Sequence, residues 1–450
     1  MPRILNPGES KVKLHPKQWA YYHSQARFNV ASAGRRSGKT DIAKRRIFSK
    51  SMRHQKYPRT RYLVGAPTHQ QAKNIYWEDL KTIFKPWTRS RIIESELKIP
   101  LFNGADVQVI GLDRPQRVEG SPVDWIFIDE IDDIKPEAWQ ENIRPALTDH
   151  LGGADFYGVP EGRRMLKKLF SEAHADKKGE WAAFSWWTEH ILPLYLGKEA
   201  AENEIASAMA DMDEHTFRRE YRAEFVDFAG RVYYSFSRET HCDRLEYDDE
   251  LPLIFCFDFN VSPGVAAIYQ NQRYIGKLKN VDRKRPISVG IGEVHVPHNS
   301  NTEIVCNRLI KDWGFHKGDI MIYGDATGGS KGSAQLHGSD WDIIRNMFRP
   351  VFGRRARYRY KRANPTERSR VNAMNTRLKA ADGTIRMLVD PKKCPHLVED
   401  FEDVSVLKGG SGEIDKKSNE DITHLTDAVG YWIETDFPVT SRKAPVSVAI

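Results

Sequence analysis

The segment Ala33-Gly34-Arg35-Arg36-Ser37-Gly38-Lys39-Thr40 constrains the fold more than any other part of the chain. It follows an apolar run at residues 28–31 and precedes a segment of helical character at residues 41–51. A loop of this kind, ending Gly-Lys-Thr between a strand and a helix, surrounds phosphates with backbone N–H groups and adds the helix dipole. The segment therefore predicts a phosphate-binding loop, with Ala33 standing where the common pattern has glycine.

Apolar runs of strand length recur through the first third of the chain and alternate with amphipathic segments. The runs lie at residues 62–65, 107–110, 125–128 and 155–159, and helical segments lie at residues 41–51 and 68–84. Strands that are apolar on both faces and separated by helices are typical of a mostly parallel sheet covered by helices. We therefore predict an α/β domain in this region.

The rest of the chain divides into a helical segment and a second α/β unit. Residues 161–222 are charged, with helical periodicity over residues 199–222, which predicts a small subdomain leading to a linker near residues 225–250. Strands are expected at residues 253–258, 265–269, 288–295 and 320–323, and a helix near residues 422–433. A chain of 450 residues is expected to contain two large domains on length alone.

Composition narrows the class of protein. A formal net charge of +8 favours a polyanionic partner, although most lysines and arginines must be solvated surface residues. The four cysteines have no CxxC spacing, which argues against a disulfide framework and a zinc site and fits a reducing cytosol. We find no signal peptide and no apolar run of about 18 residues, so we expect a soluble intracellular protein.

Two acids complete the nucleotide site that the loop predicts. Lys39 would reach the β- and γ-phosphates of a nucleoside triphosphate, and Thr40 would bind Mg²⁺. Asp129 follows the buried segment 125–128, where a carboxylate can hold the Mg²⁺ shell, and Glu130 beside it can activate the attacking water. The alternative is an acidic N-cap for the next helix, which the loop upstream makes the weaker interpretation.

Three further residues could act on the nucleotide. Gln18 lies one short helix ahead of the loop and could hydrogen-bond adenine, or it could be an ordinary surface residue. Arg35 could neutralise charge that develops on the γ-phosphate, as arginine fingers do. Arg36 could do the same or face solvent.

Three aspartates in the second unit suit a catalytic metal centre. Asp258 ends an apolar strand, with a turn and another apolar strand after it, as in RNase H-like nucleases. Asp325 follows Gly324 at a second strand end, and Asp427 lies on one helical face with His424. Carboxylates bind Mg²⁺ or Mn²⁺, and two ions about 4 Å apart can activate water and stabilise a leaving oxygen. A lone strand-end aspartate is usually a turn former, but three in this order predict a nuclease.

Two other features of the second unit allow two interpretations each. Glu293 could be a fourth metal ligand or a strand glutamate that faces water. Residues 354–362 alternate cations with tyrosines, which suits a strand that lies along a DNA backbone. The same segment could be a solvated edge strand whose charge prevents aggregation.

With both sites in place, the chain resembles the large terminase subunit of tailed double-stranded DNA bacteriophages over roughly residues 12–435. The order of the motifs carries the resemblance more than any single motif. In chain order, these are Gln18, the loop with Arg35, Asp129-Glu130, Gly158-Val159-Pro160, Phe217-Arg218-Arg219-Glu220-Tyr221, Asp258-Phe259-Asn260, Gly324-Asp325 and His424-Leu425-Thr426-Asp427-Ala428.

The resemblance implies a fold and an activity. The implied fold is α/β, with a P-loop ATPase core of the ASCE type at residues 1–165, a small helical subdomain and linker at residues 166–235, and an RNase H-like nuclease domain at residues 236–450. The implied activity is ATP-driven translocation of double-stranded DNA into an empty capsid, with endonucleolytic cutting of concatemeric DNA. ATP and Mg²⁺ are the implied cofactors, and Mn²⁺ could replace Mg²⁺ in the nuclease site.

The resemblance also assigns residues and partners. The nucleotide-binding positions are Gln18, Gly34, Arg35, Arg36, Ser37, Gly38, Lys39, Thr40 and Asp129, with Glu130 and Arg35 as catalytic residues. Asp258, Asp325 and Asp427 match the nuclease acids. The implied partners are double-stranded DNA, a portal protein, a small terminase subunit and four further copies of the chain on the portal. A monomer in solution is compatible with this assembly on the portal. The implied location is the host cytoplasm, transiently on the procapsid and not in the mature virion.

Two alternatives come from other classes. A host DNA-repair helicase-nuclease would need a second motor-like domain, and the chain after residue 165 has no second set of motor loops. A non-catalytic assembly scaffold would not need Lys39, Glu130 and the three aspartates intact.

Overall fold

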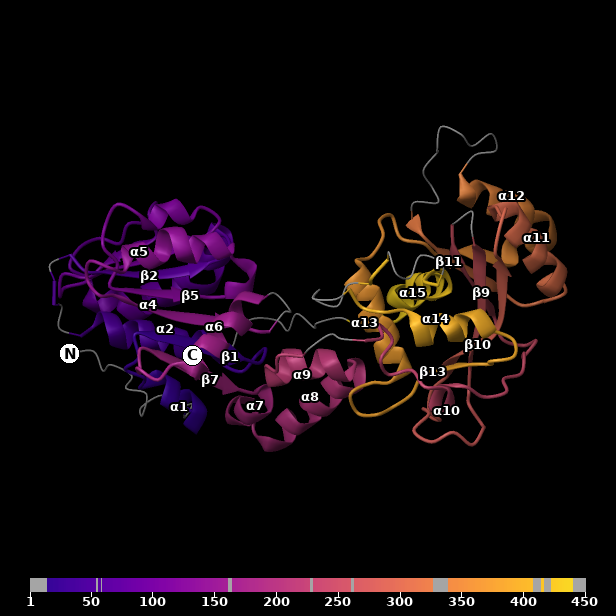
Figure 1. Cartoon of the computed structure of the whole chain (residues 1–450), viewed down its shortest axis with the longest axis horizontal. Coiled ribbons are helices and arrows are strands. Elements are labelled where there is room, and N and C mark those ends of the chain that lie inside the picture. The colour runs from indigo at the N-terminus through magenta and orange to yellow at the C-terminus, as the bar shows by residue number, and fades with distance from the viewer. Residues whose placement is uncertain are drawn as a thin grey trace. The chain divides into compact units, whose positions relative to one another are not determined.

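The computed structural model describes residues 14–53, 56–57, 59–160, 164–226, 230–259, 263–326, 339–407, 414–416 and 422–439. The chain forms two compact units, coloured indigo to magenta and orange to yellow in Figure 1. The first unit comprises residues 1–205 and 217–227, and the second comprises residues 206–216 and 228–450. Among the described helices, none combines the length and apolar content that crossing a bilayer requires.

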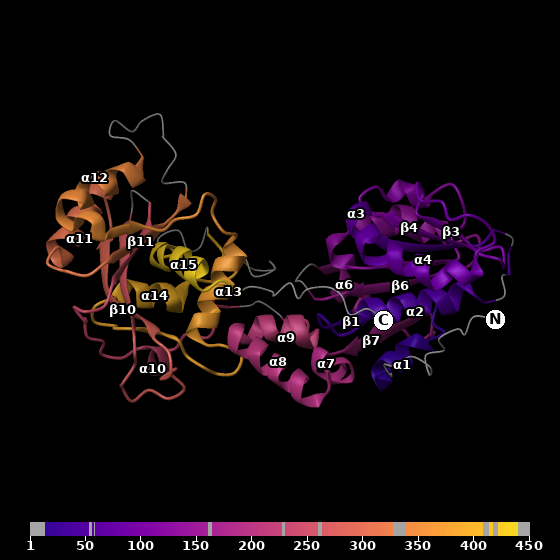
Figure 2. The ribbon, with the colours of Figure 1, turned by 180° about the vertical axis from the view of Figure 1, so that it is seen from behind.

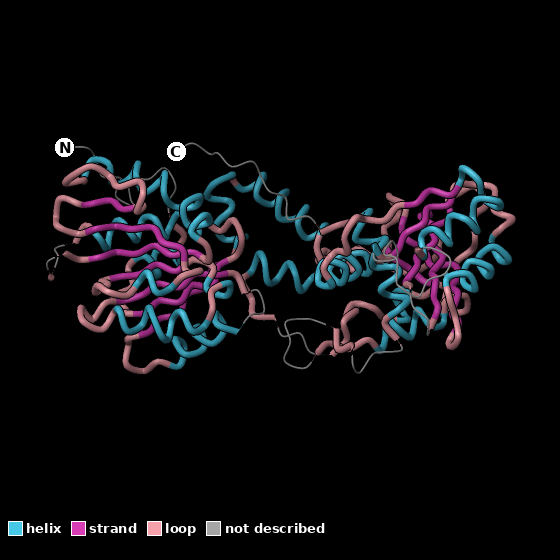
Figure 3. The backbone as a smooth tube through the Cα atoms, turned by 90° about the horizontal axis from the view of Figure 1, so that it is seen from above, coloured by secondary structure: helices cyan, strands magenta, loops and turns pink. Residues whose placement is uncertain are grey.

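A seven-stranded sheet is the centre of the first unit (Figure 3). Its strands are β1 (Phe28–Ala33), β2 (Arg61–Ala66), β3 (Lys98–Pro100), β4 (Asp106–Gly111), β5 (Trp125–Ile128), β6 (Gly153–Gly158) and β7 (Trp181–Trp186), in the order β3-β4-β2-β5-β6-β1-β7. All neighbours are parallel except β3 and β4. The predicted mostly parallel sheet is confirmed, and β6 separates β1 from β5.

Helices cover both faces of this sheet. They include α1 (Pro16–Tyr22), α2 (Lys39–Ser51), α3 (His69–Ala72), α4 (Glu78–Phe84), α5 (Arg144–Ala146) and α6 (Arg164–Ala175), with π-helical turns at Lys73–Trp77 and Ala138–Ile143. Side chains of β1 alternate between two cores, Ala31 and Ala33 in one and Phe28 and Val30 in the other. This alternation explains why β1 is apolar throughout, because neither of its faces meets water.

The segment at residues 166–235 is less helical than predicted. It contains α7 (Thr188–Leu196), α8 (Lys198–Asp211) and α9 (Glu214–Arg222), but β7 comes before them and pairs with β1 over Trp181–Trp186. Aromatic residues at both ends of β7 pack into the sheet, Trp186 fully buried and Trp181 stacked on Phe156. The edge of the sheet is therefore completed by residues beyond the predicted ATPase core.

The second unit contains a mixed six-stranded sheet. Its strands are β8 (Leu253–Asp258), β9 (Gly264–Gln272), β10 (Ile287–Val296), β11 (Ile320–Gly324), β12 (Ala356–Tyr358) and β13 (Met387–Val389), in the order β12-β11-β8-β9-β10-β13. Strand β9 is antiparallel to both β8 and β10, whereas β11 and β12 continue the sheet parallel to β8. The four predicted strands are confirmed.

Two groups of helices cover this second sheet (Figures 1 and 2). On one face lie α13 (Glu367–Leu378), α14 (Pro395–Asp403) and α15 (His424–Asp436), and on the other lie α11 (Thr302–Trp313) and α12 (Asp340–Phe352), with the short α10 (Arg238–His241) at the start of the unit. Within β8, Ile254 and Cys256 enter the first core, and Phe255 and Phe257 enter the second. The sheet is thus a central layer that holds β8 rigidly.

The predicted basic strand at residues 354–362 is mostly not a strand. Only Ala356–Tyr358 forms β12, at the edge of the sheet, after a 3₁₀ turn at Gly353–Arg355. Arg355 is used inside the fold, where it donates to the carbonyl oxygens of His316 and Val351. The alternation in the sequence therefore marks a short edge strand with flanking loops.

Candidate functional site

The loop between β1 and α2 is held from behind by two other elements of the first unit. The N–H of Gly34 donates to Trp186 O at 3.1 Å, and the N–H of Arg35 donates to Glu220 O at 2.6 Å. A Cβ at Gly34 would clash with the carbonyl of Tyr221 and the hydroxyl of Thr188. Glycine is therefore the residue that this position accepts, and the loop is anchored to β7 and α9.

Lys39 and Thr40 open helix α2. Gly38 precedes them at φ +70°, a left-handed conformation that glycine adopts readily, so the chain turns sharply into the helix. The Nζ of Lys39 lies 2.6 Å from Glu130 Oε1 and 3.7 Å from Asp129 Oδ1. Burial lowers the pKa of Lys39, but its attraction to both acids outweighs burial and leaves the pKa above its usual value. Thr40 is half-buried on the same turn.

The paired acids lie where β5 ends. Asp129 is 3% exposed, and its Oδ2 accepts from the hydroxyl of Tyr76 at 2.7 Å. Burial raises the pKa of Asp129, and Lys39 opposes that shift. Glu130 has φ +50°, a left-handed conformation uncommon for a residue with a Cβ and concentrated at functional sites. The structure therefore brings Lys39, Asp129 and Glu130 together, as the sequence predicts.

Gln18 contacts the loop from α1. Its Nε2 donates to Ser37 O at 3.1 Å, its Oε1 accepts from the N–H of His15 at 3.2 Å, and the side chain is buried. Trp186 also donates to Ser37 O, at 3.0 Å. Gln18 is thus part of the loop's support, and its amide keeps one further donor and one further acceptor site.

The two loop arginines differ in their surroundings. Arg35 is half-exposed and its Nε donates to Glu220, which also accepts from Arg219 at 3.1 Å. Burial raises the pKa of Glu220, but the two arginines outweigh burial and lower it. Arg36 is exposed and has φ +60°.

A tyrosine that sequence reasoning missed lies over the loop. A Cβ at Gly38 would lie 2.7 Å from the hydroxyl of Tyr195 on α7, and this hydroxyl donates to Asp41 Oδ2 at 3.4 Å. Burial, followed by the charge of Asp41, raises the pKa of Tyr195 to about 12. Nothing in the local sequence of α7 indicates this contact, because it depends on how α7 packs.

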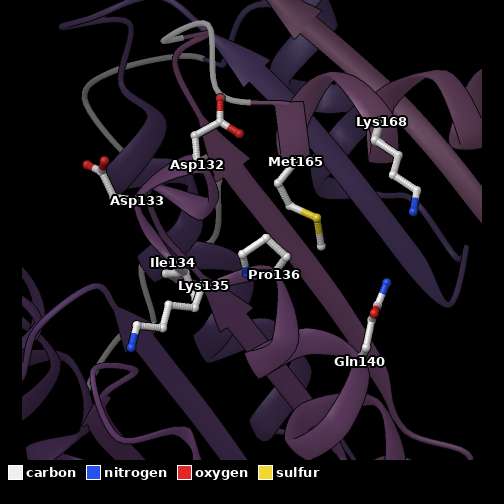
Figure 4. Close-up of a pocket in the computed structure, with 8 residues that line it drawn as sticks. All are labelled: Asp132, Asp133, Ile134, Lys135, Pro136, Gln140, Met165 and Lys168. Atoms are coloured by element: carbon white, nitrogen blue, oxygen red, sulfur yellow. The ribbon is translucent and has the colours of Figure 1, made fainter. Parts of the chain in front are cut away.

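A pocket of 380 Å³ lies just after the paired acids in the chain (Figure 4). Its lining residues come from the segment after β5 and from α6: Asp132, Asp133, Ile134, Lys135, Pro136, Gln140, Met165 and Lys168. Asp132 accepts from the N–H of Leu166 at 2.7 Å. This bond ties the segment that carries Glu130 to α6.

The three aspartates of the second unit meet at one edge of its sheet. Asp258 ends β8 and Asp325 follows β11, the parallel neighbour of β8, so both lie at the carboxyl edge. Helix α15, which carries Asp427, packs against both strands. The predicted motif Asp258-Phe259-Asn260 extends to Asn260, which lies outside the described residues.

Each aspartate is held by a different partner. His424 Nδ1 lies 3.0 Å from Asp258 Oδ2. Asn364 Nδ2 donates to Asp325 Oδ1 at 2.7 Å, and the hydroxyl of Tyr431 donates to Asp325 Oδ2 at 3.2 Å. Arg370 Nη1 donates to Asp427 Oδ1 at 2.6 Å. Sequence reasoning missed Asn364, Arg370 and Tyr431, which belong to no recognisable motif.

Tyr431 lies within the field of all three aspartates. Burial raises the pKa of its hydroxyl, Arg370 opposes that shift, and the charges of Asp325, Asp258 and Asp427 add to it. Burial likewise raises the pKa of Asp427, against Arg370 and with Asp258. Within the described ranges, however, no three His, Cys, Asp or Glu side chains are gathered closely enough to hold a metal ion. The aspartates lie at the same edge of the sheet, and each has at least one oxygen paired with a protein group.

Glu293 has a structural use. Its Oε1 accepts from the N–H and from Nδ1 of His396, at 3.0 and 2.6 Å, and its Oε2 accepts from the N–H of Leu397 at 2.9 Å. These N–H groups belong to the first turn of α14, where orphan donors need an acceptor. Glu293 therefore caps a helix, an arrangement that neither sequence interpretation included.

Known relatives match about half of the chain. Residues 30–240 match the family described as "Terminase large subunit, T4likevirus-type, N-terminal". The terminase large subunit of Escherichia phage T5 is 27% identical over 225 residues, covering 49% of this chain and 49% of that protein. The terminase large subunit of Thermus phage G20c is 26% identical over 261 residues, covering 49% of this chain and 50% of that protein. The chain thus spans about half the length of the curated relatives it matches.

Solved structures show a likeness that extends further. The large terminase of a thermophilic bacteriophage has a TM-score of 0.53 at 12% identity, covering 94% of this chain and 98% of that one. The same protein in complex with ATP-gamma-S has a TM-score of 0.51 at 12% identity, covering 94% of this chain and 99% of that one. At this identity the likeness shows a shared fold.

Proposed function

We propose that this chain, which belongs to the large terminase subunits of bacteriophages, uses ATP to move double-stranded DNA into a viral capsid and cuts that DNA with a second site. The observation that carries the proposal is the contact of Lys39 with Glu130, beside the buried Asp129. The phosphate loop follows β1 and the acid pair follows β5, and β6 lies between these two strands in the sheet. The contact therefore joins residues from two strands that are not neighbours. That strand order is the one expected for an ATPase core of the ASCE type.

ATP fits the first site by the chemistry of its residues. Lys39 supplies a positive charge to the phosphates, and the first turn of α2 presents N–H groups without helical acceptors. Thr40 and Asp129 supply hard oxygens that suit Mg²⁺, with Asp129 oriented by Tyr76. Mg²⁺ would neutralise charge on the transferred phosphate. The large terminase of the thermophilic bacteriophage binds ATP-gamma-S, which supports the same ligand here.

The ion pair between Lys39 and Glu130 indicates the order of events in the first site. A phosphate that binds Lys39 competes with Glu130, so nucleotide binding releases the carboxylate. The free carboxylate can then accept a proton from the attacking water. Arg35, once it leaves Glu220, can stabilise negative charge on the phosphate. Gln18 keeps a donor and an acceptor for adenine while it supports Ser37.

The second site supports an RNase H-like nuclease. Antiparallel β8, β9 and β10 continue through β11 and β12, which run parallel to β8, and the acids lie at the carboxyl edge. By their chemistry the carboxylates of Asp258, Asp325 and Asp427 suit Mg²⁺ or Mn²⁺, and binding would require them to come closer together and His424 and Arg370 to yield their places. Bound metal would activate water and stabilise the leaving oxygen. Before metal binds, the chain's own residues hold the carboxylates in place and screen their charge.

We assign the ATPase core to residues 1–165 together with β7, which completes its sheet, the helical subdomain and linker to the remainder of residues 166–235, and the nuclease to residues 236–450. The proposed partners are double-stranded DNA, a portal protein, a small terminase subunit and further copies of the chain in a pentamer. The site of action is the procapsid in the host cytoplasm. The basic segment at residues 354–362 remains a proposed DNA contact through its exposed side chains.

Nucleotide binding and turnover of purified variants test the first site. Lys39→Ala should weaken ATP binding, whereas Glu130→Ala should bind ATP and lose hydrolysis, because the carboxylate acts on water and Lys39 acts on phosphate. Glu137→Ala is the matched control, since Glu137 is an exposed acid seven residues further along. An unchanged rate of phosphate release in Glu130→Ala would remove the assignment.

Strand separation discriminates the host helicase-nuclease from the packaging motor. A helicase separates labelled strands of a duplex as it moves, whereas a packaging motor displaces a third strand from a triplex and leaves the duplex intact. We expect displacement without separation, and ATP-dependent unwinding would contradict the proposal.

A further inference from the structure

The loop that joins β9 to β10 carries a concentrated positive charge. Residues 273–286 contain six cations and a single carboxylate, in a chain whose whole net charge is +8. The cations are Arg273, Lys277, Lys279, Arg283, Lys284 and Arg285, and all six are exposed. The loop lies at the edge of the sheet opposite Asp258, because β9 starts beside Asp258 and runs away from it.

The cations of this loop have no acidic partners within the described part of the chain. The carboxylate of Asp282 pairs with Arg386, outside the loop. In the basic segment at residues 354–362, by contrast, Arg357 pairs with Asp319 at 2.9 Å and Lys361 pairs with Glu434. The more conspicuous basic pattern in the sequence is therefore partly neutralised, whereas the loop at residues 273–286 presents its charge to the outside.

The loop is also held in one conformation. The hydroxyl of Tyr274 donates to Asp243 and accepts from the N–H of Leu278 at 3.0 Å. Arg283 Nη2 donates to Gly276 O at 2.8 Å, and Asp282 Oδ1 accepts from the N–H of Lys284 at 3.0 Å. A solvated loop needs no such internal bonds. A preorganised one loses less conformational entropy when a ligand binds.

We propose that residues 273–285 form a second DNA-binding surface, which holds the phosphate backbone of a duplex at a distance from the nuclease acids. The proposal rests on the proposed function, in which the second unit cuts double-stranded DNA. Double-stranded DNA suits this surface because neighbouring cations on a rigid loop can each neutralise a phosphate and release a counterion. An acidic protein surface is the alternative ligand, and the experiment below separates the two.

The length of the strands sets the expected footprint. Strand β9 contains nine residues, and at about 3.4 Å per residue it places the loop about 30 Å from Asp258. B-form DNA rises about 3.4 Å per base pair, so this distance corresponds to about nine base pairs. A duplex that reaches both the acids and the loop must therefore extend nearly one helical turn beyond the cut.

The test variant replaces four loop cations with glutamine and leaves Arg283, which supports the loop. Its substitutions are Lys277→Gln, Lys279→Gln, Lys284→Gln and Arg285→Gln. The control variant removes the same charge from exposed cations on and near other elements of the second unit: Arg308→Gln, Lys311→Gln, Lys317→Gln and Lys392→Gln. Binding to a duplex of about 30 base pairs is measured by fluorescence anisotropy over a salt series, with EDTA present so that no DNA is cut.

We expect the slope of log K against log salt to fall by roughly 2 to 4 in the loop variant and by less than 1 in the control, since each phosphate contact contributes about 0.9. A duplex of about 8 base pairs cannot span from the acids to the loop, so the parent should bind it more weakly than the long duplex and with a smaller salt slope. If the four-site variant does not fold, the pairs Lys277→Gln with Lys279→Gln and Lys284→Gln with Arg285→Gln should each lower the slope by half as much.

Equal slopes for the loop variant and the parent on the long duplex would overturn the proposal and favour an acidic protein ligand. A parent that shows no salt-dependent binding to duplex DNA would instead contradict the proposed function itself. The two failures are therefore distinguishable.

Discussion

Replacing Arg46 should destabilise the first unit more than any surface substitution. Arg46 on α2 is 1% exposed, and its Nε and Nη2 donate to the two oxygens of Asp155 at 2.8 and 3.2 Å. Its Nη1 donates to the carbonyl oxygens of Tyr21, Tyr22 and Ser24 at 2.9, 2.8 and 3.2 Å. One guanidinium therefore neutralises a buried carboxylate and holds the end of α1, the helix that carries Gln18.

The magnitude follows from the charge that Arg46→Leu would leave behind. Asp155 is fully buried, and removing one partner of a buried pair costs about 3 to 5 kcal/mol. Trp125 still donates to Asp155 at 3.0 Å, which favours the lower half of that range. The double variant Arg46→Leu/Asp155→Asn removes the buried charge as well, so its loss should be at least about 2 kcal/mol smaller.

Hydrogen exchange over a urea series measures this effect separately in each unit, because it reports on peptides from β1 and β6 by themselves. With a urea slope of about 2 kcal/mol per molar, the midpoint of these peptides should fall by roughly 1.5 to 2 M. Lys198→Leu, which breaks an exposed pair with Glu202 in the first unit, should leave the midpoint unchanged. A shift below about 0.5 M in Arg46→Leu, or no recovery in the double variant, would refute the reasoning.

Three further variants test other contacts. Burial, followed by the charge of Arg46, lowers the pKa of Lys50 to about 7. Between pH 7 and about 10 the unfolded chain therefore binds one proton more than the folded chain, and the free energy of unfolding rises with pH. Urea melts of Lys50→Met should show higher stability at pH 7 and lose this rise of about 1.4 kcal/mol per pH unit. Glu220→Gln should raise basal ATP hydrolysis by up to about fivefold, because it frees Arg35 from a pair worth about 1 kcal/mol or less, and a lower rate would contradict that role. Arg370→Gln should tighten Mn²⁺ binding in calorimetry by up to about tenfold, because it removes a competing charge from Asp427, and the buried Arg377→Gln on the same helix should not.

Sequence reasoning located the parts of the sites that depend on local chemistry. Asp129 and Asp258 lie at the ends of short buried strands, and Lys39 opens the helix after the loop that follows another such strand. Such strands are recognisable because they are apolar on both faces. Parallel pairing then brings their ends to one edge of each sheet. These positions could be predicted without knowing how the helices pack.

The partners of these residues could not be predicted. Tyr76 reaches Asp129 from a helix more than fifty residues earlier, and Arg370 reaches Asp427 from α13, which packs beside α15. Both contacts depend on tertiary packing and have no local pattern. The sequence also could not show which basic side chains are neutralised, because Lys361 pairs with Glu434 only once α15 is packed in place.

Cutting and hydrolysis measured on the same preparations test the central claim of two separate active sites most directly. The assays are digestion of supercoiled plasmid with Mn²⁺ and release of phosphate from ATP, on Glu130→Ala and Asp258→Asn beside the parent. Asp258→Asn keeps the shape of the side chain and removes the charge that attracts metal, so it should abolish cutting and leave hydrolysis intact. Glu130→Ala should abolish hydrolysis and leave cutting intact. Full plasmid cutting by Asp258→Asn, or loss of both activities in either folded variant, would contradict the account.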